Sequence, residues 1–458
     1  MLRKRLEDDI FWKAVQDYIH RYLVKTVETE DFRKVLEEHS SLNLNKFFDQ
    51  WLYSKGYPRL KFTLLFNDTT KSAKVTVKQT QVNKEEGIGL FDIRVPITII
   101  DENGKSFSKT VELEEETEAS SVTFELTANV RTLEIDPHNH ILFEVDGEME
   151  GVGEEVLVNN IIHSSSLFNQ IYAARALVKK AVRPSINRLK SALSQVRGKA
   201  HYGLFAEVAE VLSSTPTDAC VELYCELLGE EKDPHALVSF TQASQSFGKD
   251  ERVRNALLKL LKDESIGYRS KTRAMQGLAN QKNEEDFEYF VSEANREKGW
   301  LQMERSAALA AIATFHNERA FEELSKRLEH GKEPQESRAA AVTAFASAAA
   351  SLSDKKKRKE AKERLLKLAG EGNNSNYNYP VRKAAVLGLV AFEEEDVVPT
   401  IESLRPLFSN QDQPWLTRRV TAIKNAKKDD QASLKKELNT LKEKVAELEK
   451  KFEKKENK

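Results

Sequence analysis

The side chains that most often do chemistry are spread thinly through this sequence. His138 and His140 lie two residues apart on a predicted turn, with Asp136 nearby. A weak surface metal site is one interpretation of this turn, but we favour a solvated turn. The other histidines show no ligand spacing: His20, His39, His163, His201, His235, His316 and His330.

Two further clusters have simple structural interpretations. Cys220 and Cys225 lie five residues apart in one predicted helix, and we interpret them as buried small residues rather than a disulfide or a redox pair. The acidic run from Glu114 to Glu116 is most simply a solvated loop tip, because nothing fixes the geometry that a cation needs. The sequence therefore predicts no catalytic, cofactor-binding or metal-binding residue.

The composition indicates a helix-rich protein of about three domains. Of the 458 residues 40% are hydrophobic and 31% are charged, and the formal net charge is -2. With a pI of about 6.6, the chain has no basic field that would attract nucleic acid. No apolar run reaches the roughly 20 residues of a membrane span, and the N-terminus turns acidic where a signal peptide would be apolar. We expect a cytoplasmic protein with neither nucleic acid nor a membrane as its partner.

Most elements that would position functional residues are helices, and between 166 and 430 they repeat. Four segments share an arginine followed by small apolar residues and then Leu, Ile or Phe, at intervals of 33 to 44 residues: Arg269, Arg305, Arg338 and Arg382. This period is typical of a paired-helix α-solenoid, and the segments resemble HEAT-type repeats. We expect each arginine to reach a carboxylate or a helix C-terminus in the next repeat. The alternative is that the arginines line a ligand groove.

Two charged stretches accompany the repeats. The run from Lys355 to Lys359 begins a helix, and we interpret it as a solvated face rather than a contact for anionic partners. In the tail, 431–458, apolar residues from Leu434 to Phe452 recur at alternating steps of four and three, which predicts a short coiled coil. About three heptads are marginal for an isolated coil. The tail is therefore expected to pair with a second copy of the chain or to fold back on the last repeat.

The first segment, 1–58, is predicted to be helical and unusually aromatic. Phe11, Val15, Tyr18 and Tyr22 recur at helical spacing, and a second aromatic stripe runs from Phe47 to Trp51. Three short helices cannot bury this much apolar surface among themselves. If no further domain covers it, we expect Phe11 and Trp12 to be partly exposed, in a patch that invites a partner.

The segment 59–147 changes to the two-residue period of strands. Apolar side chains alternate from Leu60 to Phe66 and from Phe91 to Ile99, and Asn103-Gly104 is a strong hairpin signal. Six or seven short strands predict a small antiparallel β-sandwich. Pro96 inside the longest strand favours an edge or a bulge there. Residues 148–165 are expected to be an exposed linker to the solenoid.

The run from Asn45 to Leu60, Asn-Lys-Phe-Phe-Asp-Gln-Trp-Leu-Tyr-Ser-Lys-Gly-Tyr-Pro-Arg-Leu, resembles one particular family. In the aminopeptidase N-like (gluzincin) zinc metallopeptidases, a helix of the form Phe-Phe-x-x-Trp-Leu followed by Gly-x-Pro ends the thermolysin-like catalytic domain and leads into a β-sandwich. The segments from Met1 to Trp12 and from Asp136 to Leu142 also resemble this family, in the same order. The resemblance covers about 1–145 and implies that 1–58 is the helical remnant of such a catalytic domain.

The chain departs from the family at its catalytic motifs. The family holds zinc with His-Glu-x-x-His and a further Glu, and binds the substrate amine with Gly-x-Met-Glu-Asn, and none of these motifs occurs in this sequence. The resemblance therefore implies a non-catalytic C-terminal portion of a peptidase whose relatives remove N-terminal residues from peptides. We expect no zinc in this chain and no activity by itself, whether it is a split-enzyme half, a short protein or a mis-assigned start.

The alternative function is a HEAT-repeat scaffold that binds proteins. The two hypotheses predict different partners. A peptidase portion would bind a catalytic half, and peptides once it is complemented, whereas a scaffold would bind protein partners through 166–430. Either could form a homo-oligomer through the heptads of the tail.

Overall fold

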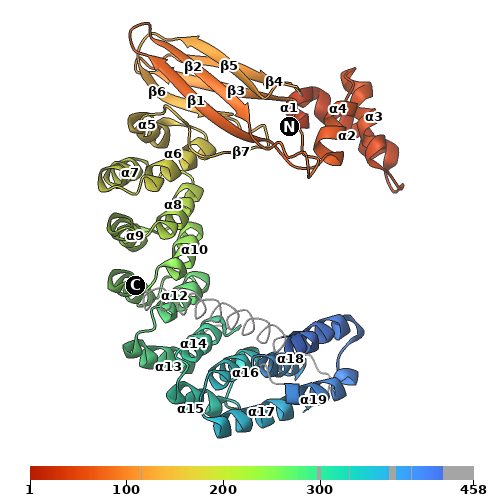
Figure 1. Cartoon of the computed structure of the whole chain (residues 1–458), viewed down its shortest axis with the longest axis vertical. Coiled ribbons are helices and arrows are strands. Elements are labelled where there is room, and N and C mark those ends of the chain that lie inside the picture. The colour runs from red at the N-terminus through yellow and green to blue at the C-terminus, as the bar shows by residue number, and fades with distance from the viewer. Residues whose placement is uncertain (115, 297–300, 330, 371–377, 393–394, 426–458) are drawn as a thin grey trace, which may run out of the picture. The chain divides into compact units, whose positions relative to one another are not determined.

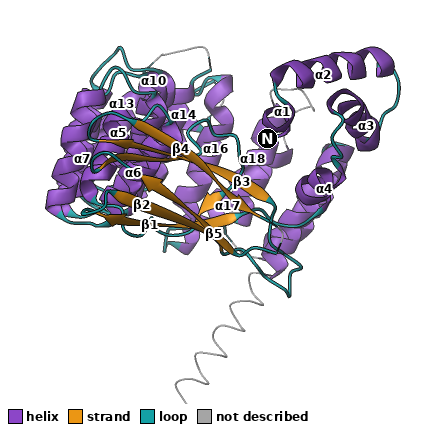
Figure 2. Ribbon diagram, turned by 90° about the horizontal axis from the view of Figure 1, so that it is seen from above, coloured by secondary structure: helices purple, strands orange, loops and turns teal. Residues whose placement is uncertain are grey.

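The computed structural model describes residues 1–114, 116–296, 301–329, 331–370, 378–392 and 395–425. The chain is mainly α-helical with a small, largely antiparallel β part, which confirms the predicted fold class (Figure 1, Figure 2). It divides after Leu227 into two compact units. The predicted coiled coil in 431–458 lies outside the described residues.

The first unit begins with the predicted helices. Their bounds are α1 (Leu2–Leu6), α2 (Asp8–Tyr22), α3 (Thr29–Ser40), α4 (Asn45–Phe48) and a π-helical turn, η1 (Asp49–Tyr53). Exposed residues from Ser54 to Tyr57 then lead into the first strand. The helices lie at one end of the strands (Figure 1).

Two sheets follow, and their inner residues form one hydrophobic core. The strands are β1 (Arg59–Asn67), β2 (Ser72–Gln79), β3 (Ile93–Asp101), β4 (Ser106–Leu113), β5 (Ala119–Glu125), β6 (Val130–Ile135) and β7 (Glu144–Val145). Their order is β5-β2-β1-β7 in one sheet and β4-β3-β6 in the other. The Asn103-Gly104 hairpin joins β3 to β4 as predicted, and Gly104 has the positive φ that such a turn requires.

Pro96 has a different place from the one expected. It lies in β3, which is the central strand of its sheet rather than an edge, and the irregular pairing in β3 falls at Ile100 and Asp101. The proline is tolerated because β6 ends at Ile135. No carbonyl of β6 therefore lies opposite position 96 to accept the N–H that a proline lacks. The Pro96 carbonyl still accepts a hydrogen bond from the Asp136 N–H at 2.8 Å.

Residues 148–165 were expected to be an exposed linker, but part of this segment packs against the β part and part of it forms a helix. The backbone of Glu150 donates to Phe62 O at 3.0 Å and accepts from Leu64 N at 2.8 Å. Gly151 passes so close to β1 that a Cβ there would lie 2.0 Å from Leu64 O, at a φ of +76°. Glu154–His163 then form helix α5.

Two asparagines attach the helices that follow the strands to the sheet. Asn160 in α5 donates to Leu133 O at 2.9 Å and accepts from Leu133 N at 3.1 Å. Asn169 in α6 (Leu167–Lys179) makes the same pair of bonds to Ile135, both at 2.9 Å. The two buried amides thus satisfy the edge of β6 in the way that a further strand would.

Each unit contains further helices, and we call those of the second unit the helical array. In the first unit they are α7 (Arg183–Val196), α8 (Tyr202–Ser214) and α9 (Asp218–Glu230), which crosses the division. In the second they are α10 (Pro234–Ala243), η2 (Ser244–Ser246), α11 (Glu251–Leu261), α12 (Tyr268–Asn280), η3 (Glu284–Asp286), α13 (Phe287–Asn295), α14 (Met303–Ala313), α15 (Glu318–Arg327), α16 (Gln335–Ala350), α17 (Lys355–Gly370), α18 (Asn378–Val390), η4 (Glu395–Val397), α19 (Val398–Ser403), η5 (Arg405–Leu407) and η6 (Asn410–Asp412).

Within the second unit, α10, α12, α14, α16 and α18 pack each on the next, and small residues set their spacing. A Cβ on Gly277 would lie 1.9 Å from Ser244 Oγ, and one on Gly388 would lie 2.4 Å from Ala346 Cβ. Only glycine allows these backbones to approach so closely, as the sequence pattern predicted.

Candidate functional site

The histidine turn follows β6 and brings two imidazole rings near each other. The rings of His138 and His140 lie 5.4 Å apart on the turn after β6. Asp136 is buried and accepts from Ile141 N at 2.8 Å, while its Oδ1 has no hydrogen-bond partner in the described chain. Burial lowers the pKa of His140. Across the described ranges, no group of three or more His, Cys, Asp or Glu side chains could hold a metal ion.

Two of the four repeat arginines, Arg305 and Arg382, have partners of the predicted kind. Arg338 is half-buried. Arg305 donates to Arg296 O, at the end of α13, at 3.1 Å and lies 3.6 Å from Glu333. Arg382 is fully buried and donates to Ala369 O, near the end of α17, at 2.8 Å. Both therefore reach a helix C-terminus, as predicted, but it is that of the preceding helix and not one in the next repeat.

The register of the first repeat was wrong. Arg269 is exposed and lies over its own neighbour, the Tyr268 ring. Lys271 occupies the buried position instead, with Nζ 3.3 Å from Glu264. The sequence pattern also missed Arg254, whose guanidinium makes two bonds to buried Asp286 at 2.8 and 3.0 Å.

The most unusual surface belongs to the first helices. Their own core consists of six buried residues: Leu6, Ala14, Val35, Leu36, Leu44 and Phe48. Large apolar side chains remain exposed around it, among them Trp12 and Ile19 at 53% and Leu52 at 58%. Phe11 is half-buried against Trp12. The predicted exposure of Phe11 and Trp12 is confirmed. We call the exposed apolar side chains of residues 12–53 the helical apolar surface.

A strained turn between α2 and α3 extends this surface. Leu23 is 65% exposed and Val24 100% exposed, and Val24 has a φ of +57°. A β-branched residue in the left-handed region is strained, because its Cβ crowds the backbone. No burial of its side chain within the described chain offsets that strain. Local propensity did not predict this feature.

Ring contacts and ion pairs both join α2 to α3. The Tyr18 ring lies 5.0 Å from Phe32, and Arg21 pairs with Glu38. Within α3, Arg33 pairs with Glu30 and Glu37, and the hydrogen bonds that it donates to Glu30 and then to Glu37 raise the pKa of its guanidinium. Asp17 binds Arg21 and His39, and these bonds lower the pKa of its carboxyl. The helices therefore keep a defined arrangement although their core is small.

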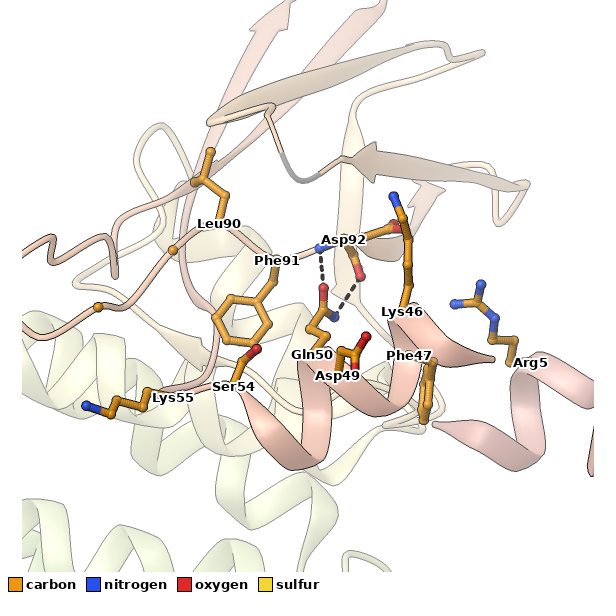
Figure 3. A pocket seen from close by; sticks show the side chains of 12 residues that line it. Arg5, Lys46, Phe47, Asp49, Gln50, Ser54, Lys55, Leu90, Phe91 and Asp92 are labelled. Carbon is orange, nitrogen blue, oxygen red and sulfur yellow. Dashed lines mark hydrogen bonds between the residues drawn. The ribbon is translucent and has the colours of Figure 1, made fainter. Parts of the chain in front are cut away.

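The helices are attached to the β part by a small set of contacts around a pocket (Figure 3). Gln50 in η1 donates to Asp92 O at 3.0 Å and accepts from Asp92 N at 2.7 Å. The Trp51 ring lies 5.5 Å from Phe91. The pocket has a volume of about 360 Å³, and Arg5, Lys46 and Asp49 are among its lining residues. Both charge signs line it, so its electrostatics select no ligand class.

Comparison with known proteins identifies limited similarities. No protein-family model matches the chain. A stretch of 71 residues, 16% of this chain, is 35% identical to glutamyl aminopeptidase of Homo sapiens and covers 7% of that protein. This supports a relation of the stretch to the aminopeptidases.

A structural similarity spans more of the chain at lower identity. The structure of Legionella pneumophila aminopeptidase A in complex with aspartic acid aligns with 88% of this chain, at 16% identity and a TM-score of 0.44. This chain covers 49% of that chain. At this TM-score and identity, the likeness is too distant to establish a common fold.

Proposed function

We propose that this chain serves as the non-catalytic C-terminal portion of an aminopeptidase N-like zinc metallopeptidase. In this proposal the helical apolar surface packs against the family's catalytic domain, which carries the zinc and removes N-terminal residues from peptides. The observation that carries the proposal is the exposure of Trp12, Ile19 and Leu23 on helices whose sequence resembles the end of that domain. The local similarity to glutamyl aminopeptidase supports it.

The chain's own residues do not fit a zinc site. The sequence lacks His-Glu-x-x-His, and the described residues offer no group of three ligands. The role of this chain would be to complete the packing of the catalytic domain and to position the β part and the helical array beside it. Zinc would supply its chemistry from the other domain.

The first test is chemical. We expect metal analysis of the purified chain to find less than about 0.1 zinc per chain, because structural and catalytic zinc sites need at least three protein ligands. We also expect no hydrolysis of aminoacyl-p-nitroanilides. One tightly bound zinc per chain together with aminopeptidase activity would refute the proposal.

The second test is physical. A separately expressed catalytic domain of an aminopeptidase N-like peptidase that lacks its own C-terminal helices should bind the chain in sedimentation velocity experiments. Trp12→Asp and Val24→Asp should each weaken this binding by about tenfold or more, because they place a charge on the apolar surface. Leu65→Asp is the matched control, since Leu65 is 62% exposed on β1, away from the helices. Equal binding by all three variants would contradict the proposal.

A protein-interaction scaffold is the second candidate function. It is favoured by the close packing of α12, α14, α16 and α18 around small residues, which is typical of HEAT-like solenoids. A scaffold would bind its partners through 166–430, so removal of 1–58 should leave binding intact. If that deletion abolishes all partner binding, the peptidase portion is the better description.

A further inference from the structure

The short strand β7 presents backbone groups on an outer edge of its sheet. Glu144 N donates to Pro58 O at 3.0 Å and Asp146 N donates to Leu60 O at 2.8 Å, so both residues face β1. Alternate residues of a strand direct their N–H and C=O groups to opposite edges. The N–H and C=O of Val145 therefore face away from β1, and no group of the described chain pairs with them.

The same edge is already closed a few residues further on. Tyr172 in α6 accepts a hydrogen bond from Met149 N at 2.5 Å and donates to Gly147 O at 3.4 Å. Burial raises the pKa of the Tyr172 phenol to about 12, so the phenol stays protonated and can donate at neutral pH. The Tyr172 hydroxyl thus pairs with Gly147 O and Met149 N. This leaves the N–H and C=O of Val145 as the open position of this edge.

A pocket of about 370 Å³ lies beside this open position, between residues 143–148 and α6. Phe143, Phe168 and Ile171 give it an apolar floor, and the two phenyl rings meet edge to face at 5.5 Å. Its lining also carries two residues of each charge sign, Glu144 and Glu148 against Arg175 and Lys179. Lys179 and Glu148 lie 3.6 Å apart. Figure 1 shows β7 next to α6, and residues of both elements line the pocket.

We propose that this edge and pocket bind an extended peptide segment by β-augmentation. The peptide main chain pairs with the N–H and C=O of Val145, and one large apolar side chain enters the pocket beside it. A donor and an acceptor side by side on a strand edge match a peptide backbone. The charges that line the pocket balance, so they demand no net charge from the ligand. Because Tyr172 closes the edge beyond Val145, we expect a short contact of two or three residues.

The site is independent of the proposed peptidase role, because it uses no residue of α1–α4. A peptidase portion could use it to hold peptides, and a scaffold could use it to hold a partner's extended segment. In both cases the ligand is an extended, neutral peptide with one Leu- or Phe-sized side chain.

The test uses the full chain and a fluorescein-labelled, capped peptide of alternating Ser and Thr with one central Leu. We expect saturable binding in fluorescence anisotropy and slower hydrogen exchange at the Val145 amide when the peptide is present. Replacing the central Leu by Asp should abolish binding, and N-methylation of that Leu should weaken it about tenfold by removing a backbone donor. Equal binding by all three peptides would overturn the proposal.

Two variants examine the two halves of the site separately. Val145→Pro removes the outward N–H without touching a bond to β1, and Ile171→Glu places a charge on the pocket floor. Each should weaken peptide binding by about tenfold or more, while Leu65→Asp should bind like the unmodified chain. Unchanged binding by both variants, or an unprotected Val145 amide, would refute the proposal. Neither result bears on the proposed peptidase role, whose test is binding at the helical apolar surface.

Discussion

The first helices and the helical array of the second unit differ in how far they bury their large apolar side chains. In the array, Phe290, Phe345 and Leu389 are fully buried, because each helix pair is covered by the next. In α1–α4, side chains as large as Trp12 and Ile19 are more than half exposed. The difference shows that amphipathic helices alone do not make a core. They also need a neighbour for each apolar face.

The two regions also differ in their ion pairs. The array buries Arg254 against Asp286, and Arg382 against helix carbonyls. The first helices keep most of their pairs in solvent, as in Arg3 with Asp8 and Arg21 with Glu38. Exposed pairs contribute little to stability. We therefore expect the array to lose stability when its contacts are altered, whereas changes to the helical apolar surface should alter association instead.

The largest effect is expected at the buried pair. Arg254→Met should lower the free energy of unfolding by about 3–5 kcal/mol, because it leaves Asp286 buried without its counter-ion. Urea denaturation followed by circular dichroism measures this loss. Arg183→Met is the control, since Arg183 and Glu222 are both about half exposed, and it should cost less than about 1 kcal/mol. Equal losses in the two variants would break the contrast between buried and exposed pairs.

A smaller effect is expected where two helices of the array touch. Gly388→Ala would place a Cβ 2.4 Å from Ala346 Cβ, so α16 and α18 must separate. We expect a loss of about 1–2 kcal/mol after the gain in helix propensity. Gly229→Ala is the matched control, because a Cβ at Gly229 in α9 meets nothing within 4 Å. It should be neutral or slightly stabilising. Thermal melting of both variants would show whether the close approach matters.

The last described part of the array should also show a pH dependence. Bonds from Tyr379, then Lys383 and Ser409, lower the pKa of Asp412 to about 2. A carboxylate with a lowered pKa stabilises the fold above its unfolded pKa of about 4, and this stabilisation is lost as the pH falls from about 4 to about 2. Asp412→Asn should therefore be less stable than the unmodified chain at pH 7, with a difference that shrinks in acid. Denaturation curves of both proteins at pH 7 and pH 3 measure this. The same difference in unfolding free energy between the two proteins at both pH values would contradict the prediction.

The sequence predicted much of the fold because its signals there are local. Alternation from Leu60 to Phe66 and the Asn103-Gly104 turn identified strands and a hairpin that the structure contains. The helix α5 was missed because the expected linker showed only one short apolar piece. The function of Asn160 could not be predicted, because its partner, Leu133, lies on a strand far away in the sequence.

The candidate surface was predictable in part, and for a physical reason. The aromatic side chains of 1–58 have more apolar surface than three short helices can bury among themselves. The exposure of Phe11 and Trp12 follows from this limit. The left-handed Val24 does not follow from any propensity, since valine disfavours that conformation. The register error at Arg269 arose because arginine and lysine can fill the same buried position, as Lys271 does.

The smallest effect on stability is expected at the most conspicuous side chain. Trp12→Ser should change the free energy of unfolding by less than about 0.5 kcal/mol, because Trp12 is 53% exposed. In the described part of the chain, its ring makes one aromatic contact, with Phe11, and one cation–π contact, with Arg3. The same variant should bind less of a hydrophobic dye and stay soluble at higher concentration, since it shrinks an exposed apolar patch. Urea denaturation and dye titration measure the two properties on one sample. A loss of more than about 2 kcal/mol would place Trp12 in the folding core, and the contrast between the first helices and the array would then fail.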